Sequence, residues 1–184
     1  EKKRILLVQD KKILGQEKLS LAEPLGLLTV SETELLIIDA QGKLIQVGYS
    51  DEAFNVSGEM ETPMAVKSFA LNPYGSMLAY TNSESTELHG MFLGPQQDQI
   101  LAQDIPEPVA LAFAQSGRFV AVGTKSGAVH VVDIATRQAA HVLRPTDFDI
   151  SPVQHLCAGP DGTWIVVYED NWLARWSADG ELMD

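Results

Sequence analysis

Three segments of this chain superimpose on one spacing, and this internal repeat constrains the fold more than any other feature. Each segment opens with a small or apolar residue, carries apolar residues three and five places later, and ends at a glycine. The segments are 66–75, 108–117 and 153–162. Subtracting the positions of the closing glycines gives periods of 42 (117 − 75) and 45 (162 − 117). The chain therefore repeats one structural unit about every forty residues.

Each unit is interpreted as four short strands joined by tight turns. In the unit from residue 108, apolar runs at 109–114, 118–123, 128–133 and 138–143 are separated by turns, one of them Lys125-Ser126-Gly127. A forty-residue repeat of short strands is typical of a β-propeller blade. A β-sandwich of short strands is an alternative, although a sandwich needs no such repeat.

The repeat predicts an all-β protein whose residues 1–184 form a single propeller domain. About four four-stranded blades are expected, at 24–62, 66–105, 108–148 and 153–184. Residues 1–20 provide only two strands of a partial N-terminal blade. A small ring, a fragment of a longer chain and a ring completed by a partner are all compatible with this count. An incomplete ring or fragment is favoured, and the absence of an initial Met indicates an excised or processed piece.

In the unit from residue 108, the segments 116–123 and 132–136 together form a recognisable pattern, and the second segment contains Val132-Asp133. A further piece of the same pattern lies at 159–162, in the next unit. These segments resemble the WD-repeat family, with Val132-Asp133 in the place of the Trp-Asp pair. The other units have Val47-Gly48, Met91-Phe92 and Trp176-Ser177 at that place, and none has the family's Gly-His pair. The resemblance implies divergent WD-type blades that dock peptides and neighbouring subunits without catalysis.

Composition narrows the classes of partner. The formal net charge is −12, which repels nucleic-acid phosphates and anionic lipids, so neither is expected as a direct partner. No run of eighteen apolar residues exists in the sequence. The single cysteine, Cys157, is expected to be a small buried residue of a strand and not a nucleophile. One unpaired cysteine favours a reducing, intracellular location, cytoplasmic or nuclear.

No motif in the sequence predicts an enzyme, a metal or a cofactor. The four histidines form no His-x-His pair, there is no cysteine cluster, and the glycine-rich phosphate loops are absent. We therefore expect no catalytic residues, no metal and no cofactor. The alternative is a propeller whose central funnel binds a small ligand or supports catalysis.

The candidate site lies in loops expected to enter successive blades. Carboxylates accompanied by apolar residues recur there, without Lys or Arg inside the short acidic stretches. Such loops would share one face of a propeller and could hold a basic peptide or protein segment. The alternative is that they are ordinary solvated loops. The predicted partner-binding residues are Glu59, Glu61, Asp104, Glu107, Asp147, Phe148 and Asp149.

Overall fold

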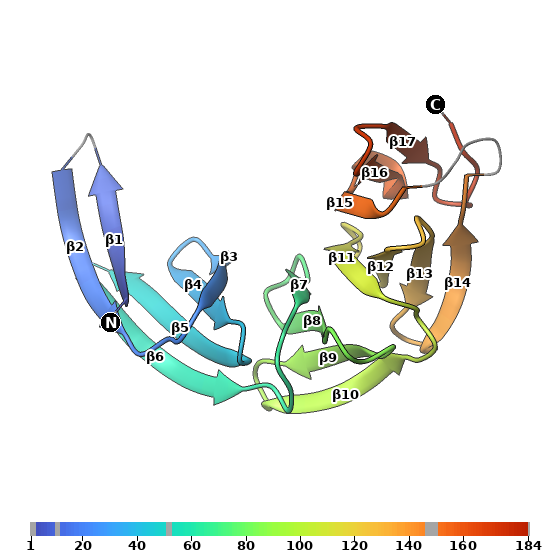
Figure 1. The fold of residues 1–184 in the computed structure, drawn as a ribbon. Coiled ribbons are helices and arrows are strands. Elements are labelled where there is room, and N and C mark those ends of the chain that lie inside the picture. The colour runs from blue at the N-terminus through green and yellow to red at the C-terminus, as the bar shows by residue number, and fades with distance from the viewer. Residues whose placement is uncertain (1–2, 10–11, 51–52, 146–150, 184) are drawn as a thin grey trace. The chain divides into compact units, whose positions relative to one another are not determined.

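The computed structural model describes residues 3–9, 12–50, 53–145 and 151–183. These residues form strands β1 to β17 and one short 3-10 turn, Pro160–Gly162 (Figure 1). Within each sheet, neighbouring strands are consecutive in the chain and antiparallel. The chain divides into two compact units, Glu1–Val66 and Lys67–Asp184. The prediction of an all-β protein is confirmed.

The first unit contains a two-stranded and a four-stranded sheet, as the partial and complete blades predict. The hairpin consists of β1 (Lys3–Gln9) and β2 (Lys12–Leu19). The four-stranded sheet, blade 1, consists of β3 (Pro24–Ser31), β4 (Glu34–Asp39), β5 (Lys43–Ser50) and β6 (Ala53–Glu61). Its middle strands β4 and β5 are rich in β-branched and leucine residues and largely buried, whereas the outermost strand β6 is mostly exposed.

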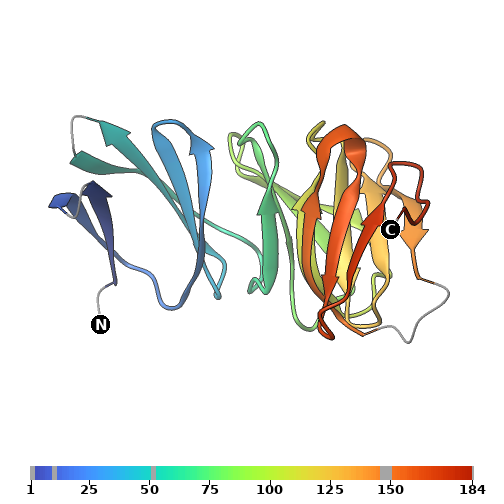
Figure 2. The same ribbon diagram turned by 90° about the horizontal axis from the view of Figure 1, so that it is seen from above.

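The second unit contains three sheets that follow one another along the chain (Figure 2). Blade 2 consists of β7 (Ser68–Leu71), β8 (Met77–Thr81), β9 (Leu88–Phe92) and β10 (Gln97–Ala102). Blade 3 consists of β11 (Pro108–Phe113), β12 (Phe119–Thr124), β13 (Val129–Asp133) and β14 (Gln138–Leu143). Blade 4 consists of β15 (Val153–Ala158), β16 (Trp164–Tyr168) and β17 (Leu173–Trp176).

The glycines that close the three repeats lie in the turn between the first and second strands of blades 2, 3 and 4. Gly75, Gly117 and Gly162 have φ values of +66°, +66° and +77°. Glycine adopts this left-handed conformation without the steric cost that a Cβ imposes. The repeated glycine is therefore explained by the backbone of the turn, and the predicted register of the repeat is confirmed.

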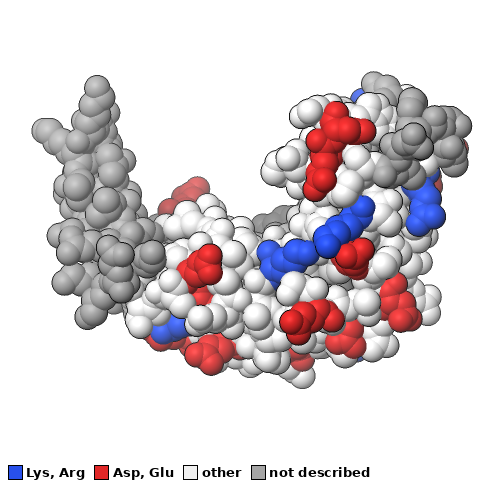
Figure 3. Space-filling model, viewed as in Figure 1, with Lys and Arg blue, Asp and Glu red and all other residues white. Residues whose placement is uncertain are grey.

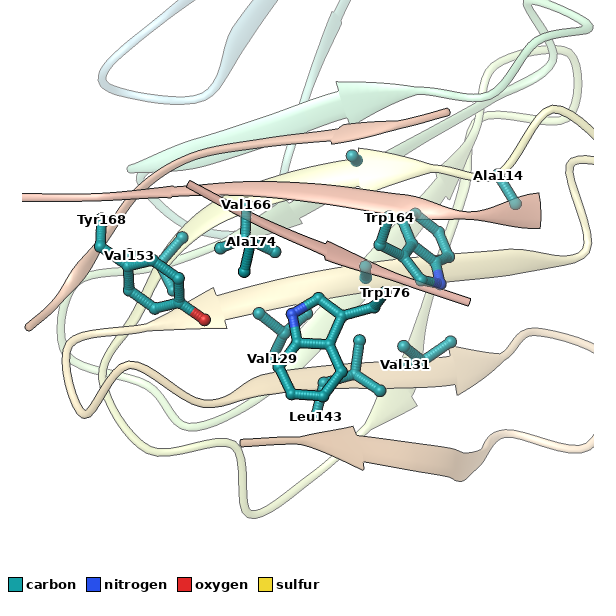
Figure 4. Packing of buried hydrophobic residues seen from close by; sticks show 12 residues of the cluster. Ala114, Val129, Val131, Leu143, Val153, Trp164, Val166, Tyr168, Ala174 and Trp176 are labelled. Carbon is teal, nitrogen blue, oxygen red and sulfur yellow. The ribbon is translucent and has the colours of Figure 1, made fainter. Parts of the chain in front are cut away.

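Two apolar clusters fill the spaces between the blades of the second unit. One cluster, between blades 2 and 3, includes Leu101 and Val120. The other, between blades 3 and 4, includes Val131, Trp164 and Trp176 (Figure 4). Trp164 and Trp176 are only 2% and 4% exposed, so packing between blades accounts for both rings.

Two local predictions in blade 4 were wrong. Four strands were expected in the unit at 153–184, but the described residues after β17 form one isolated bridge, between Leu182 and Trp176. Two flanking hydrogen bonds, Ser177 N–H to Glu181 O and Met183 N–H to Arg175 O, are too few to make a ladder. Cys157 was expected to be buried and is exposed. It alternates along β15 with residues packed against blade 3, so its side chain lies on the opposite face.

Candidate functional site

The loops of blades 2, 3 and 4 gather at one end of the second unit. The Ser68 hydroxyl donates to the Val109 carbonyl at 2.7 Å, so β7 and β11 begin together. A Cβ placed on Gly123, beside the start of β11, would lie 2.5 Å from Cγ1 of Val153, where β15 begins. The three sheets therefore present the same end. We call residues 67, 82–87, 103–107, 125–128, 144–145, 151–152 and 169–172 the loop end.

Backbone hydrogen bonds join the two loops of each blade at this end. In blade 2 the Ile105 N–H donates to the Thr86 carbonyl at 2.9 Å. In blade 3 the Lys125 N–H donates to the Glu107 carbonyl at 3.1 Å. These bonds satisfy backbone groups that the strand ladders leave unpaired. These hydrogen bonds hold the backbone of the loops in place, and so they help to position the side chains of the loop end.

The described residues of the loop end are predominantly acidic. Four of their carboxylates are exposed and form no salt bridge with any described residue; they are Glu84, Asp104, Glu169 and Asp170. Glu87 and Glu107 are also present, against three cations, Lys67, Lys125 and Arg144. On the face shown in Figure 3, acidic side chains of the described residues form separate patches with basic ones among them. The four unpaired carboxylates can attract a cationic group.

Glu59 and Glu61 do not lie in a loop, and this part of the prediction was wrong. Both belong to β6, the outermost strand of blade 1 in the first unit. The Glu59 carboxylate forms an ion pair with the Lys43 ammonium group at 2.9 Å. Met60, between the two glutamates, is buried. The strand was missed because it is paired on one side only and mostly exposed, so it carries few apolar residues.

Asp104 and Glu107 lie in the loop between β10 and β11, as predicted. Both adopt positive φ, +59° and +43°. Asp104 is exposed, whereas Glu107 forms an ion pair with Lys125 at 3.0 Å. Neighbouring loops therefore bring a lysine to one carboxylate, which the spacing of the acidic stretches did not indicate. Asp147, Phe148 and Asp149 lie outside the described residues.

A side-chain network that the sequence did not indicate ties the loop end to the interior of blade 2. His89 contacts Asp98 through Nδ1 at 3.0 Å and Glu87 through Nε2 at 3.2 Å. The Tyr80 hydroxyl donates to Asp98 at 2.7 Å, and the Gln103 amide donates to Glu87 at 2.9 Å. One buried imidazole therefore holds two carboxylates, and no sequence motif could have shown it because the residues come from different strands.

The network shifts the pKa values of Glu87 and Tyr80. Hydrogen bonds from Gln103 and His89 lower the pKa of Glu87. Burial, with the hydrogen bond to Asp98, raises the pKa of Tyr80 well above its ordinary range. Glu87 is thus kept ionised and Tyr80 neutral. Such an arrangement positions a loop carboxylate and does not activate a nucleophile.

The described residues contain no group of three or more His, Cys, Asp or Glu side chains suited to a metal ion. In the described part of the chain, no helix has the length and apolar character needed to cross a bilayer.

Comparison with known proteins identifies the fold. No family model matches the chain, and neither does any curated protein. Among solved structures, hydrazine synthase from Kuenenia stuttgartiensis is similar with a TM-score of 0.72 and 16% identity, over 90% of this chain and 49% of that chain. Hsv2 from Kluyveromyces lactis is similar with a TM-score of 0.69 and 12% identity, over 89% and 50%.

These similarities and the successive antiparallel sheets define the class of fold: this chain has a β-propeller fold. It spans about half the length of each of these two structures, as expected for a propeller fragment.

Proposed function

We propose that this chain is a non-catalytic protein-binding module of a multi-subunit complex, which docks a Lys- and Arg-rich segment of a partner at its loop end. The observation that carries the proposal is the set of four exposed carboxylates, Glu84, Asp104, Glu169 and Asp170, none paired with a described cation. Two blades contribute them at one end of a compact unit. A basic segment lying across these loops would gain several ion pairs at once.

The proposal extends to the type of propeller and its location. The segments 116–123 and 132–136 support a divergent WD-type module, since they keep the turn glycine and the aspartate of that pattern. Asp133 accepts hydrogen bonds from the Arg118 guanidinium at 2.7 and 3.1 Å, which stabilises the turns at the other end of blade 3. The single cysteine favours an intracellular compartment.

Charge neutralisation with a matched control tests the proposal. The first variant combines Glu84→Gln, Asp104→Asn and Glu169→Gln at the loop end. The control combines Asp161→Asn, Asp179→Asn and Glu181→Gln, which removes three negative charges from exposed positions at the opposite end of the same unit. Both variants have the same net charge, so a difference between them reports position and not overall charge.

The probe is an unstructured Lys- and Arg-rich peptide, titrated by fluorescence anisotropy at low and moderate salt. The loop-end variant is expected to weaken binding about tenfold or more at low salt, whereas the control loses much less. Equal losses in the two variants would show that binding depends on net charge alone. Unchanged binding by the loop-end variant would exclude the loop end as the docking site.

A further inference from the structure

A cavity of about 200 Å³ lies between blades 3 and 4. Apolar and small side chains form most of its wall, among them Phe119, Val131, Trp164, Ala140 and Ala178. Ser116, His141 and Gly162 contribute at the turns and at β14. The cavity opens among the turns opposite to the loop end. An engineered apolar cavity of about 150 Å³ is known to bind benzene, so this volume accommodates one aromatic ring.

The internal repeat shows what occupies the corresponding place at the preceding junction. Tyr74, in the first turn of blade 2, extends onto the equivalent turn of blade 3. A Cβ placed on Gly117 would lie 2.6 Å from Cε2 of Tyr74, so the ring lies directly on this glycine. The Tyr74 hydroxyl donates to the Ser116 carbonyl at 3.2 Å. A phenol ring thus bridges blades 2 and 3, although it remains largely exposed.

One repeat later, the position of the tyrosine is taken by another residue, whereas the glycine under its ring is retained. Adding the period of 42 to Tyr74 gives Ser116, and adding 45 to Gly117 gives Gly162. Both of these residues line the cavity. A serine side chain is too short to extend across the junction. A Cβ placed on Gly162 would lie 3.2 Å from the Cβ of Ala178, and no described side chain of blade 3 lies within 4 Å of that position.

A second bridging side chain is also absent from this junction. In the turn between the third and fourth strands, Arg137 of blade 3 donates to Gln99 of blade 2 at 2.5 Å. The corresponding residue of blade 4 is Gly180, which shares the positive φ of Arg137, +88° against +58°. Gly180 lies beside His141 but extends no side chain toward blade 3. The junction between blades 3 and 4 therefore lacks both bridging side chains that are present at the preceding junction.

We propose that the cavity between blades 3 and 4 binds a phenol ring supplied from outside the chain. The ring lies on Gly162, as that of Tyr74 lies on Gly117, with its edge toward Phe119 and Trp164. Its hydroxyl donates to a backbone carbonyl of the turn at 159–163, whose conformation differs from that of the blade 3 turn because Asp161 has φ +59°. A free phenol and a tyrosine side chain of a partner share this chemistry.

Fluorine NMR of p-fluorophenol with the full chain tests the proposal, because the ligand signal broadens or shifts on binding. Competition by p-cresol is expected in either case. Competition by N-acetyl-tyrosinamide as well would indicate a tyrosine side chain as the natural occupant, and competition by p-cresol alone would indicate a free phenol. Fluorobenzene, which has no hydroxyl, is expected to bind more weakly because it cannot donate to the turn.

Two substitutions should close the cavity from different walls. Ser116→Tyr restores the bridging tyrosine from within the chain, and Ala140→Leu fills the space from β14. Each is expected to weaken p-fluorophenol binding at least about tenfold. The matched control is Ala139→Leu, one residue earlier on β14 and not part of the cavity wall. Absence of p-fluorophenol binding would overturn the proposal, and so would binding that persists in both cavity-filling variants when circular dichroism shows them folded.

Discussion

Two fully buried tyrosines differ in hydrogen bonding, and removing their hydroxyl groups should have different effects on stability. Tyr80 and Tyr168 are 0% and 1% exposed. The Tyr80 hydroxyl donates to the Asp98 carboxylate at 2.7 Å. The Tyr168 hydroxyl has no hydrogen-bond partner among the described residues, and neither has the indole N–H of Trp176 toward which it points (Figure 4). Burial raises the pKa of Tyr168 to about 12.

The expected magnitudes follow from these environments. Tyr80→Phe removes a hydrogen bond to a charged group and leaves Asp98 less satisfied, which costs about 1.5–3 kcal/mol. Tyr168→Phe removes a buried hydroxyl that makes no bond and keeps the ring stacked on Trp172, at 5.2 Å between centroids. It is therefore expected to be neutral, or to stabilise by up to about 2 kcal/mol. Both substitutions remove one oxygen atom and preserve the ring.

Urea denaturation, followed by circular dichroism, measures the two free energies of unfolding. In a protein of this size each kcal/mol also corresponds to a shift in Tm of about 2–4 °C. Tyr80→Phe should lower the Tm and Tyr168→Phe should leave it unchanged or raise it. A loss of more than about 1 kcal/mol in Tyr168→Phe, with no loss in Tyr80→Phe, would refute this reasoning.

Two further predictions concern a turn and a half-buried histidine, His130. Gly42 has φ +93°, and a Cβ there would lie 2.6 Å from the Met64 carbonyl oxygen, so Gly42→Ala should lower the free energy of unfolding by at least about 1 kcal/mol. The control is Gly94→Ala, whose Cβ would meet nothing within 4 Å and which should therefore cost less. Equal losses in the two variants would contradict the steric argument. Burial, and secondarily the charge of Arg144, lowers the pKa of His130 from 6.5. The unfolded chain therefore takes up this proton first, and the free energy of unfolding should decline as the pH falls below about 6.5. His130→Gln should remove part of that decline in urea titrations at several pH values, whereas a slope identical to that of the parent protein would contradict the shift.

The repeat made most of the fold predictable because its signals are local. Gly75, Gly117 and Gly162 mark turns that need positive φ, and buried middle strands such as β12 are recognisable from continuous apolar runs. The outer strand β6 was missed because it is mostly exposed and carries little apolar pattern. Glu59 and Glu61 were therefore placed in a loop that does not exist there.

The candidate site was only partly predictable, because it depends on contacts between distant residues. Asp104 was placed correctly from its position between two strand patterns. The approach of Lys125 to Glu107 depends on the pairing of two loops eighteen residues apart, and the contacts of His89 depend on strand register. The carboxylates of Glu84 and Glu169 were missed because the loops between second and third strands were not expected to contribute to the site.

The central claim, that the loop end docks a basic segment, is tested most directly by hydrogen–deuterium exchange with and without the Lys- and Arg-rich peptide. Bound peptide should slow amide exchange in the loops at 82–87, 103–107 and 169–172. The turns at 115–118, 134–137 and 159–163, at the opposite end of the same unit, should exchange at unchanged rates. Protection confined to those opposite turns, or no protection at saturating peptide, would contradict the account.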